Sequence, residues 1–398
     1  MLWGFDDQVE WLRLLTKTRK EPDNMTQNPH SESSLYMAME LSNQEWKLAF
    51  GDGKQTRLVG IPARDQERLK REVAKAKVKM GLPAEVPVYS CYEAGRDGFW
   101  IHRMLEEAGI RNLVVDAASI EVNRRMRRAK TDRMDALKLL AMLLRHWLHG
   151  ERTHWSAVRV PSEADEAQRR HHRNEERLKK ERTQHLVRMK SLAVLHGICL
   201  SRLPKDWTTV RDWKGRPLPP ELVRELEQER ERLEVVDRQL KEIAERRRTR
   251  MRAAKKGAEA TSAERWAAKL AGARGVGEDT AWKLAHEFFG WREFRNRRQV
   301  GAAAGLTGSP YSSGDSQREQ GISKAGNARV RHLMTELAWR WLRFQPHSAL
   351  AKWYATRFAE GTGRMRRVGI VALSRKLLIA LWRYGAHGVV PEGALIMA

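Results

Sequence analysis

Cysteine is almost absent from this sequence, since Cys91 and Cys199 are the only two among 398 residues. Their scarcity and wide separation exclude a disulfide framework and a four-cysteine zinc site, and they suit a reducing compartment. Long apolar runs are also missing. The run over residues 136–144 is interrupted by Lys138 and followed by Arg145, so nothing approaches the roughly 20 apolar residues of a membrane span.

A secretory signal is lacking as well. Asp6, Asp7 and Glu10 precede any apolar core, and no small-residue cleavage site follows them. We therefore expect a cytoplasmic protein. Residues 21–34 mix proline, asparagine and serine without a period, which predicts a mobile leader over residues 1–34.

Acidic residues are in deficit, because 50 Asp and Glu face 75 Lys and Arg and leave a net charge of +25. Hydrophobic residues at 41% still provide enough material for packed cores, so wholesale disorder and a fibre are excluded. The length predicts two or three domains. A surplus of this size favours a polyanionic partner, and without a membrane span the phosphate backbone of nucleic acid is the natural choice.

The first predicted domain covers residues 35–160 and is α/β. A hairpin meander comes first, with Asp52-Gly53 as the turn between its second and third strands, and helices then alternate with strands. The predicted strands are 35–42, 46–50, 56–61, 86–92 and 112–117, and the predicted helices are 64–80, 97–108 and 131–147. An RNase H-like sheet has this order of elements.

Beyond residue 160 the pattern is helical. A charged helix over residues 163–195 and a loop over 196–220 precede a second helix with apolar residues at steps of four and three. These seam residues are Leu222, Leu226, Leu233, Val236, Leu240 and Ile243, with Glu229 as the one polar interruption. Residues 161–260 therefore predict a coiled coil, antiparallel or intermolecular. A helical hairpin packed on its own domain and a dimerisation arm both remain open.

The last predicted domain, residues 261–398, is also α-helical. Its helices are expected at 279–288, 328–344 and 370–384, with a polar loop over 308–327. Gly275 and Gly277 resemble half of a helix-hairpin-helix, in which backbone N–H groups approach a phosphate at a helix N-terminus. A tight interhelical turn explains the same two glycines equally well. His171 and His172, adjacent on a charged helix, are expected to be exposed.

Two acidic residues begin the predicted helix 131–147. Asp132 and Asp135 are three residues apart, so both carboxylates leave one face and favour a divalent cation between them. Glu40 and Glu93 end the first and fourth predicted strands. If those strands are neighbours, the four carboxylates converge on Mg²⁺, which prefers oxygen ligands, and two such ions clamp the oxygens of a phosphodiester.

Each acid also has a structural interpretation. Asp132 suits an N-terminal helix cap, and Asp135 and Glu93 suit surface ion pairs. Basic residues directly before the pair favour the metal interpretation, because they bring phosphates to it. They are Arg124, Arg125, Arg127, Arg128 and Lys130.

Further basic residues are predicted to contact phosphates. The tail of the second long helix, residues 246–256, holds seven basic residues and no acid. Its arginines are Arg246, Arg247, Arg248, Arg250 and Arg252. In the last domain, Arg318 and Lys324 follow Ser313, whose hydroxyl is a candidate nucleophile beside a glycine. An ordinary serine-rich loop is the alternative.

The order of these segments resembles one family. AMELSN, CYEAGRDG and KTDRMDA precede the charged helices, and ARGVGEDTA and SSGDSQREQGISKAGN follow them. The set is similar to the DEDD transposases of insertion-sequence family one-hundred-and-ten, the bridge-RNA-guided recombinases, over nearly the whole chain from Leu35 to about Tyr384.

The resemblance implies a RuvC-like domain of RNase H fold and a C-terminal transposase domain. Glu40, Glu93, Asp132 and Asp135 would bind Mg²⁺, and Ser313 would form a 5′-phosphoserine link to DNA. It also implies a composite site from two subunits of a dimer or tetramer, joined by the coiled coil, and a noncoding guide RNA that pairs with donor and target DNA. The family usually has aspartate where this chain has Glu40, whose extra methylene shifts the ion or the strand.

Two other functions fit the same residues. A RuvC-like structure-selective nuclease would use the acids and leave Ser313 with a structural role. A non-catalytic, basic, coiled-coil protein that binds nucleic acid would use neither. A covalent protein–DNA adduct distinguishes the three.

Overall fold

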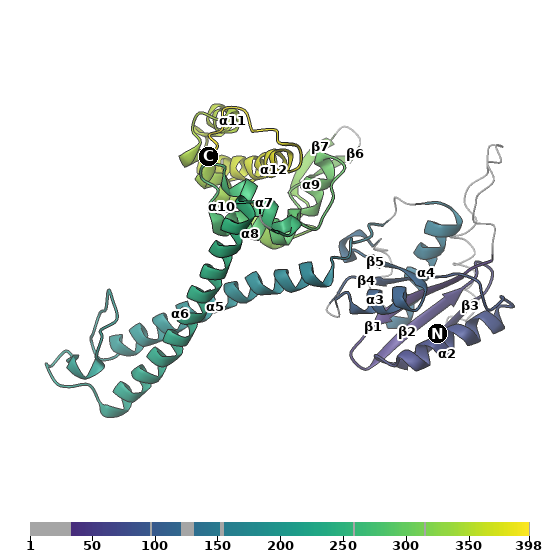
Figure 1. The fold of residues 1–398 in the computed structure, drawn as a ribbon, viewed down its shortest axis with the longest axis horizontal. Helices are drawn as coiled ribbons and strands as arrows, with labels where there is room; N and C mark the ends of the chain where they lie inside the picture. Colours follow the sequence, from purple (N-terminus) through teal and green to yellow (C-terminus); the bar gives the residue numbers. More distant parts are fainter. Residues whose placement is uncertain are drawn as a thin grey trace. The chain divides into compact units, whose positions relative to one another are not determined.

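The fold was analysed in a computed structural model, which describes residues 33–95, 98–120, 131–151, 155–257, 259–313 and 316–397 (Figure 1). The predicted leader lies outside these ranges except for its last two residues. The chain divides after Val160 into two compact units, each described by itself. No helix within the described ranges has the length and apolar character needed to span a membrane.

The first unit is an α/β domain built on a mixed five-stranded sheet. The strand order is β3-β2-β1-β4-β5, in which β1 is antiparallel to β2 and parallel to β4. The strands are β1 (Leu35–Leu41), β2 (Glu45–Gly51), β3 (Thr56–Pro62), β4 (Val88–Glu93) and β5 (Ile110–Val115). The helices are α2 (Gln66–Lys79), α3 (Trp100–Glu107) and α4 (Asp132–Leu148). The predicted α/β class is confirmed.

The turn between β2 and β3 forms as the sequence predicts. The Asp52 carboxylate accepts hydrogen bonds from the backbone N–H groups of Lys54, at 2.8 Å, and Gln55, at 2.6 Å. Gly53 adopts φ 91°, in the left-handed region that favours glycine. The hairpin therefore closes locally and sets the register of β2 on β3.

The two faces of the sheet are covered by different helices. Residues alternate along β1, so Met37 and Met39 join the core with α2 and α3, whereas Tyr36 and Ala38 join the core with α4. Both layers are apolar, which explains why β1 is buried over most of its length. The α4 face is the one that carries the candidate site.

The second unit is mainly helical. It begins with α5 (Glu163–Val194) and α6 (Pro220–Lys255), which pack side by side and are called the arm below (Figure 1). Seven further helical segments and one hairpin follow. They are α7 (Ser262–Ala271), α8 (Glu278–Leu284), the π-turn η4 (Ala285–Phe289), α9 (Arg297–Ala303), β6 (Gly308–Ser313), β7 (Ser316–Ile322), α10 (Ala328–Phe344), α11 (Ala349–Phe358) and α12 (Gly363–His387).

The predicted seam of the second long helix is partly buried in the arm. Leu226, Leu233 and Val236 are buried, and Glu229 among them is only 3% exposed. Leu226 and Leu233 share a core with Met189 and Ala193 of α5. The seam residues therefore face the other helix of the same chain.

The predicted polar loop over residues 308–327 is wrong for its first part. Residues 308–322 form the antiparallel hairpin β6–β7, in which Ser313 is opposite Ser316. These strands lack alternating apolar residues, so the usual sequence signal for a strand is missing. The Gly-Asp dipeptide between the two serines is typical of a two-residue turn that connects the strands of a β-hairpin. This dipeptide was the feature of the sequence from which the hairpin could have been predicted.

Candidate functional site

Glu40 and Glu93 lie at the same edge of the sheet. In the parallel pair β1–β4, Met39 is opposite Tyr92, and Glu40 and Glu93 are the next residues on each strand. Alternation places Glu40 on the face of Ala38 and places Glu93 on the face of Cys91. Both glutamates therefore belong to the face that α4 covers, at the carboxyl ends of two adjacent strands.

The start of α4 lies at this edge too, because the helix runs antiparallel to β1 and β4. Near the end of α4, Trp147 packs on Tyr89, at the beginning of β4, with ring centroids 4.3 Å apart. In the middle of the helix, Leu139 accepts a weak hydrogen bond from the Cys91 thiol at 3.8 Å. The first turn of α4 therefore extends toward the carboxyl ends of the strands.

The two aspartates continue the sheet-facing stripe of α4. Asp132 precedes the buried Ala136 by four residues, and Asp135 precedes the buried Leu139 by four. The helix cap is Thr131, whose hydroxyl accepts a hydrogen bond from the backbone N–H of Met134 at 3.3 Å. The alternative that Asp132 caps the helix is therefore wrong.

These four acids share an edge without closing around one point. Within the described ranges, no three Asp, Glu, His or Cys side chains are close enough together to hold a metal ion. Glu93 and Asp132 are exposed, whereas Glu40 and Asp135 are half-buried. The oxygen donors suit a hard divalent cation in kind, but the four side chains are not gathered into a ligand set. The basic segment before the helix, Arg124 to Lys130, lies outside the described residues.

Ser313 is the last paired residue of β6, at the end of the hairpin next to Gly314. Arg318 pairs with Tyr311 on the opposite strand. The side chains of Ser313 and Arg318 lie outside what the structure describes. Lys324 follows β7 with φ 57°, and its backbone N–H donates to the carbonyl of Gly305 at 3.2 Å, while its side chain is exposed.

Glu287 is a site residue that the sequence analysis did not predict, and it is only 2% exposed within the π-turn η4. It accepts hydrogen bonds from Arg173 Nε at 2.8 Å and from Asn327 Nδ2 at 3.2 Å, and it lies 2.7 Å from His172 Nε2. Burial by itself would raise the pKa of Glu287, but the contacts with His172 and Arg173 outweigh burial and hold it well below its ordinary value. This carboxylate joins the arm to the segment that follows the Ser313 hairpin.

The prediction for the two adjacent histidines is half correct. His171 is exposed, but His172 is only 2% exposed, because it faces Glu287. His172, Glu175 and Leu178 are buried at steps of three residues along α5. That period was the signal that could have identified His172 as an inward-facing residue.

The basic tail of α6 divides into paired and exposed arginines. Arg247 lies 2.7 Å from Glu175 and 2.9 Å from Asp279, and its side chain is only 12% exposed. Arg250 is paired with Glu264. Arg246 is exposed and lies 3.9 Å from Glu242, and Arg248 and Arg252 are exposed without an ion pair within the described residues. The nucleic-acid role predicted for the run therefore fits Arg248 and Arg252 best.

Gly275 and Gly277 form the tight connection between α7 and α8. Gly275 has φ 90°, and a Cβ there would lie 3.0 Å from Cβ of Phe344. A Cβ at Gly277 would lie 3.1 Å from the guanidinium of Arg340. Close packing against α10 accounts for both glycines, and phosphate contact there stays a prediction.

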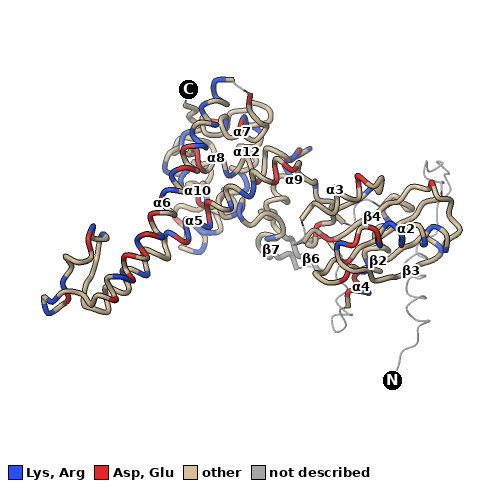
Figure 2. Tube along the Cα trace, turned by 60° about the horizontal axis from the view of Figure 1, so that its bottom comes forward, with Lys and Arg blue, Asp and Glu red and all other residues tan. Residues whose placement is uncertain are grey.

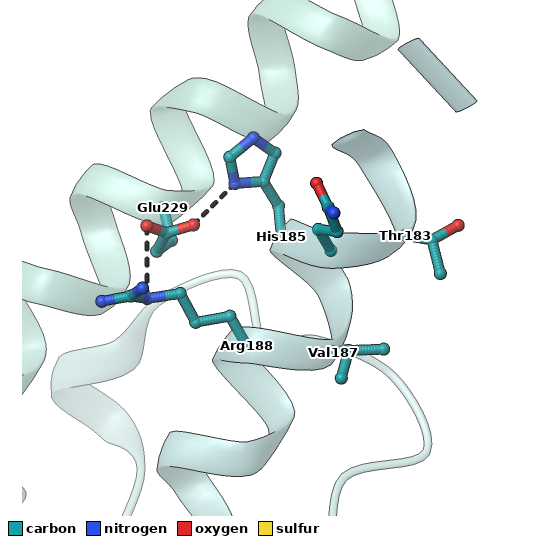
Figure 3. A pocket seen from close by; sticks show the side chains of 6 residues that line it. Thr183, His185, Val187, Arg188 and Glu229 are labelled. Carbon is teal, nitrogen blue, oxygen red and sulfur yellow. Dashed lines mark hydrogen bonds and ion pairs between the residues drawn. The ribbon is translucent and has the colours of Figure 1, made fainter. Parts of the chain in front are cut away.

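An open hollow on the arm surrounds Glu229, the polar interruption in the seam (Figure 3). Glu229 lies 2.6 Å from Nδ1 of His185 and 3.5 Å from Nε of Arg188. Burial by itself would raise the pKa of Glu229, but the contacts with His185 and Arg232 together outweigh burial and lower it. The hollow is therefore an internal charge cluster of the arm, with Val187 exposed at its side.

Comparison with known proteins gives consistent results. Residues 267–353, which include the hairpin, match the family described as Transposase IS116/IS110/IS902. The chain is 39% identical over 376 residues to "Putative transposase y4rJ" of Sinorhizobium fredii, covering 91% of this chain and 94% of that protein. It is 31% identical over 293 residues to "Putative transposase y4qE" of the same organism, covering 72% of this chain and 66% of that one.

Proposed function

The chain belongs to the IS116/IS110/IS902 family of transposases, and on that premise we propose that it cleaves and exchanges DNA strands at an insertion element, with Ser313 as nucleophile. The observation that carries the proposal is the shared sheet edge of Glu40, Glu93, Asp132 and Asp135. Four carboxylates at one edge of a strongly basic protein suit phosphodiester chemistry.

The first unit is proposed to be RuvC-like, with an RNase H fold. Its strand order supports this, because the antiparallel meander β3-β2-β1 continues into the parallel strands β4 and β5. The end of the first strand, the end of the fourth strand and the start of a helix then meet at one edge. That arrangement gives each acid a rigid element to hold its backbone.

The four carboxylates would hold Mg²⁺ between them and the DNA. The bound ion would supply positive charge for the phosphate oxygens at the scissile position. Glu40 departs from the aspartate of the family pattern, and its extra methylene would shift the ion or the strand while keeping a carboxylate available as a ligand.

Ser313 would carry the covalent step. Its Oγ attacks phosphorus, the P–O3′ bond breaks, the 3′ hydroxyl leaves, and the Oγ proton passes to a base, so the 5′ phosphate stays on Ser313. A 3′ hydroxyl from the partner strand then attacks the same phosphorus. The Oγ–P bond breaks, the serine regains a proton, and a new phosphodiester forms.

Partners follow from the same proposal. A noncoding RNA of the element would pair with donor and target DNA, so that base pairing supplies the sequence specificity. The arm would act as a coiled coil that joins copies of the chain into a dimer or a tetramer. Since α5 and α6 bury their shared apolar seam within one chain, the contact between copies would use other side chains of the arm.

A second candidate is a metal-dependent nuclease in which Ser313 is structural. One observation favours it: the acids and Ser313 belong to different compact units, so the acidic edge is complete without the hairpin. The two candidates differ in whether DNA becomes covalently attached to the protein.

The test is a denaturing-gel assay for a protein–DNA adduct on DNA that contains the ends of the element, with Mg²⁺ and the element's RNA. The wild-type protein is expected to form the adduct and the Ser313→Ala variant to lose it. Ser312→Ala, the adjacent serine of the same strand, is the matched control and is expected to retain it. Cutting without any adduct would favour the nuclease, and binding without cutting would leave only a nucleic-acid-binding protein.

A further inference from the structure

Positive charge without acidic partners gathers on the last two helices. Residues 349–387, which span α11 and α12, contain eight Lys and Arg and a single acid, Glu360. Within the described ranges, no ion pair involves a residue of α11 or α12. The ion pairs nearest to these helices in sequence are Arg329–Glu176 and His332–Glu336, in which Arg329, His332 and Glu336 belong to α10. Most of these basic side chains are exposed. Their charge is therefore not neutralised inside the second unit.

The start of α12 folds back on the end of α11 and brings their cations together. The Tyr354 hydroxyl donates to the carbonyl of Arg366 at 3.4 Å, and Arg366 Nε donates to the carbonyl of Gly361 at 3.1 Å. Gly369 packs so closely on Phe358 that a Cβ there would lie 2.5 Å from the ring. The first turn of α12 is therefore fixed against α11.

A tryptophan holds two more cations beside this turn. Nζ of Lys376 lies 4.6 Å from the ring centre of Trp353, and the guanidinium of Arg357 lies 5.8 Å from it. At a rise of roughly 1.5 Å per residue, Arg364 and Lys376 are about 18 Å apart along α12. We call Arg357, Arg364, Arg366, Arg367 and Lys376, with Trp353, the α11–α12 surface.

The charge at the start of α12 opposes the helix dipole. Acidic residues normally stabilise the first turn of a helix, and α12 has none there. It has Arg364, Arg366 and Arg367 instead, all of them exposed. This arrangement costs stability in the isolated chain, and an anion bound outside the helix would offset that cost.

We propose that the α11–α12 surface binds the phosphodiester backbone of duplex DNA without reading its sequence. The proposal rests on the proposed function, because a transposase acts on DNA, and it assigns a contact outside the hairpin and the acidic edge. Arg364 and Arg367 are three residues apart and share one face of α12, beside Arg357 at the end of α11, and each phosphate that such a cluster neutralises releases counterions. No recognition helix for the major groove is required.

The test measures equilibrium binding of a fluorescent duplex of unrelated sequence as a function of salt, in EDTA so that no cleavage occurs. The variant is Arg357→Gln, Arg364→Gln, Arg367→Gln, none of which removes a hydrogen bond of the described chain. The matched control, Arg177→Gln, Arg182→Gln, Arg188→Gln, removes the same charge from arginines that are paired with acids on the arm. Each phosphate contact contributes roughly 0.9 to the steepness with which log affinity falls against log salt. The α11–α12 variant is therefore expected to make this slope shallower by about 2 to 3, and the control by less than about 1.

Three outcomes would overturn the proposal. An unchanged slope in the α11–α12 variant would do so directly. Equal reductions in both variants would show that total charge matters rather than this surface. A loss confined to binding of single-stranded RNA or of phosphatidylserine vesicles would assign the surface to another partner. Since the measurement needs no chemistry at Ser313 or at the acids, it stays informative if no adduct is ever found, and the adduct assay stays informative if this surface fails.

Discussion

The arm and the α11–α12 surface are both rich in Lys and Arg, but they use that charge differently. Helices α5 and α6 carry 20 basic and 15 acidic residues, which alternate along the arm (Figure 2). Arg182 pairs with Asp237 across the two helices, and Arg188 pairs with Glu225. On α11 and α12 the described cations have no such partners. Net charge therefore indicates that a polyanion binds, whereas ion pairing indicates which surface is available to it.

The largest effect is expected at the acidic sheet edge, where Glu40, Glu93, Asp132 and Asp135 lie on two strand ends and one helix start. Asp135→Asn should abolish strand transfer, because a neutral amide is a far weaker ligand for Mg²⁺. Loss of an outer partner of a metal site already costs about 10–100-fold, so the loss of a direct ligand should cost at least ~100-fold. Strand transfer and thermal unfolding are measured together, and the unfolding temperature should stay unchanged.

Asp237→Asn is the control from the arm. It removes one carboxylate from an exposed ion pair and should leave strand transfer intact. Near-wild-type recombination by Asp135→Asn would refute the metal role of the edge. Equal losses of strand transfer in both variants would show that the acids of the sheet edge do not differ in function from the acids of the arm.

The next effect concerns stability, because Glu287 is the most heavily paired acid in the second unit. Glu287→Ala leaves the buried His172 and the half-buried Arg173 without their carboxylate and should cost about 3 kcal/mol of unfolding free energy. Glu225→Gln, which breaks an exposed pair on the arm, should cost less than about 1 kcal/mol. Urea unfolding followed by tryptophan fluorescence measures both.

The same variant gives a pH dependence with a defined sign. Because the folded chain lowers the pKa of Glu287, the stabilisation is fully present above the ordinary glutamate pKa and declines as the pH falls below it. The stability gap between wild type and Glu287→Ala should therefore narrow on acidification. A gap that widens, or that is absent at neutral pH, would contradict the assigned ion pairs.

Local patterns in the sequence were sufficient for the sheet edge. The apolar run that begins at residue 35, the Asp52-Gly53 turn and the start of the helix at Asp132 each depend on neighbours in the chain. They predicted β1, β4 and α4 with the acids at their ends, and the structure adds that β1 and β4 are adjacent.

Contacts between distant residues were not predictable in the same way. Glu287 meets His172 across 115 residues, and no local period announces that pair. The start of α12 was also missed, because Arg364 to Arg367 offer no apolar stripe, although Thr362 caps the helix. Ion pairing also depends on residues that are distant in the sequence. The prediction from sequence therefore assigned the whole basic tail of α6 to one nucleic-acid-binding surface.

The smallest expected effect separates two neighbouring arginines of that tail. Arg247 is held by Glu175 and Asp279, whereas Arg248 is exposed. Arg247→Gln should therefore lower the unfolding free energy by about 1–3 kcal/mol, since it leaves the buried Glu175 with Lys179 as its one remaining basic partner, and should leave the salt dependence of DNA binding unchanged. Arg248→Gln should do the reverse, with native stability and a slope reduced by about 0.9.

Each arginine is the control for the other, because the two substitutions remove the same charge from adjacent positions of one helix. Any account based on total charge requires equal slopes for the two variants. A lower slope for Arg247→Gln with native stability would mean that its ion pairs open when DNA binds, and pairing would then no longer distinguish the arm from the α11–α12 surface. Opposite responses would extend the distinction from two regions of the molecule down to two consecutive residues.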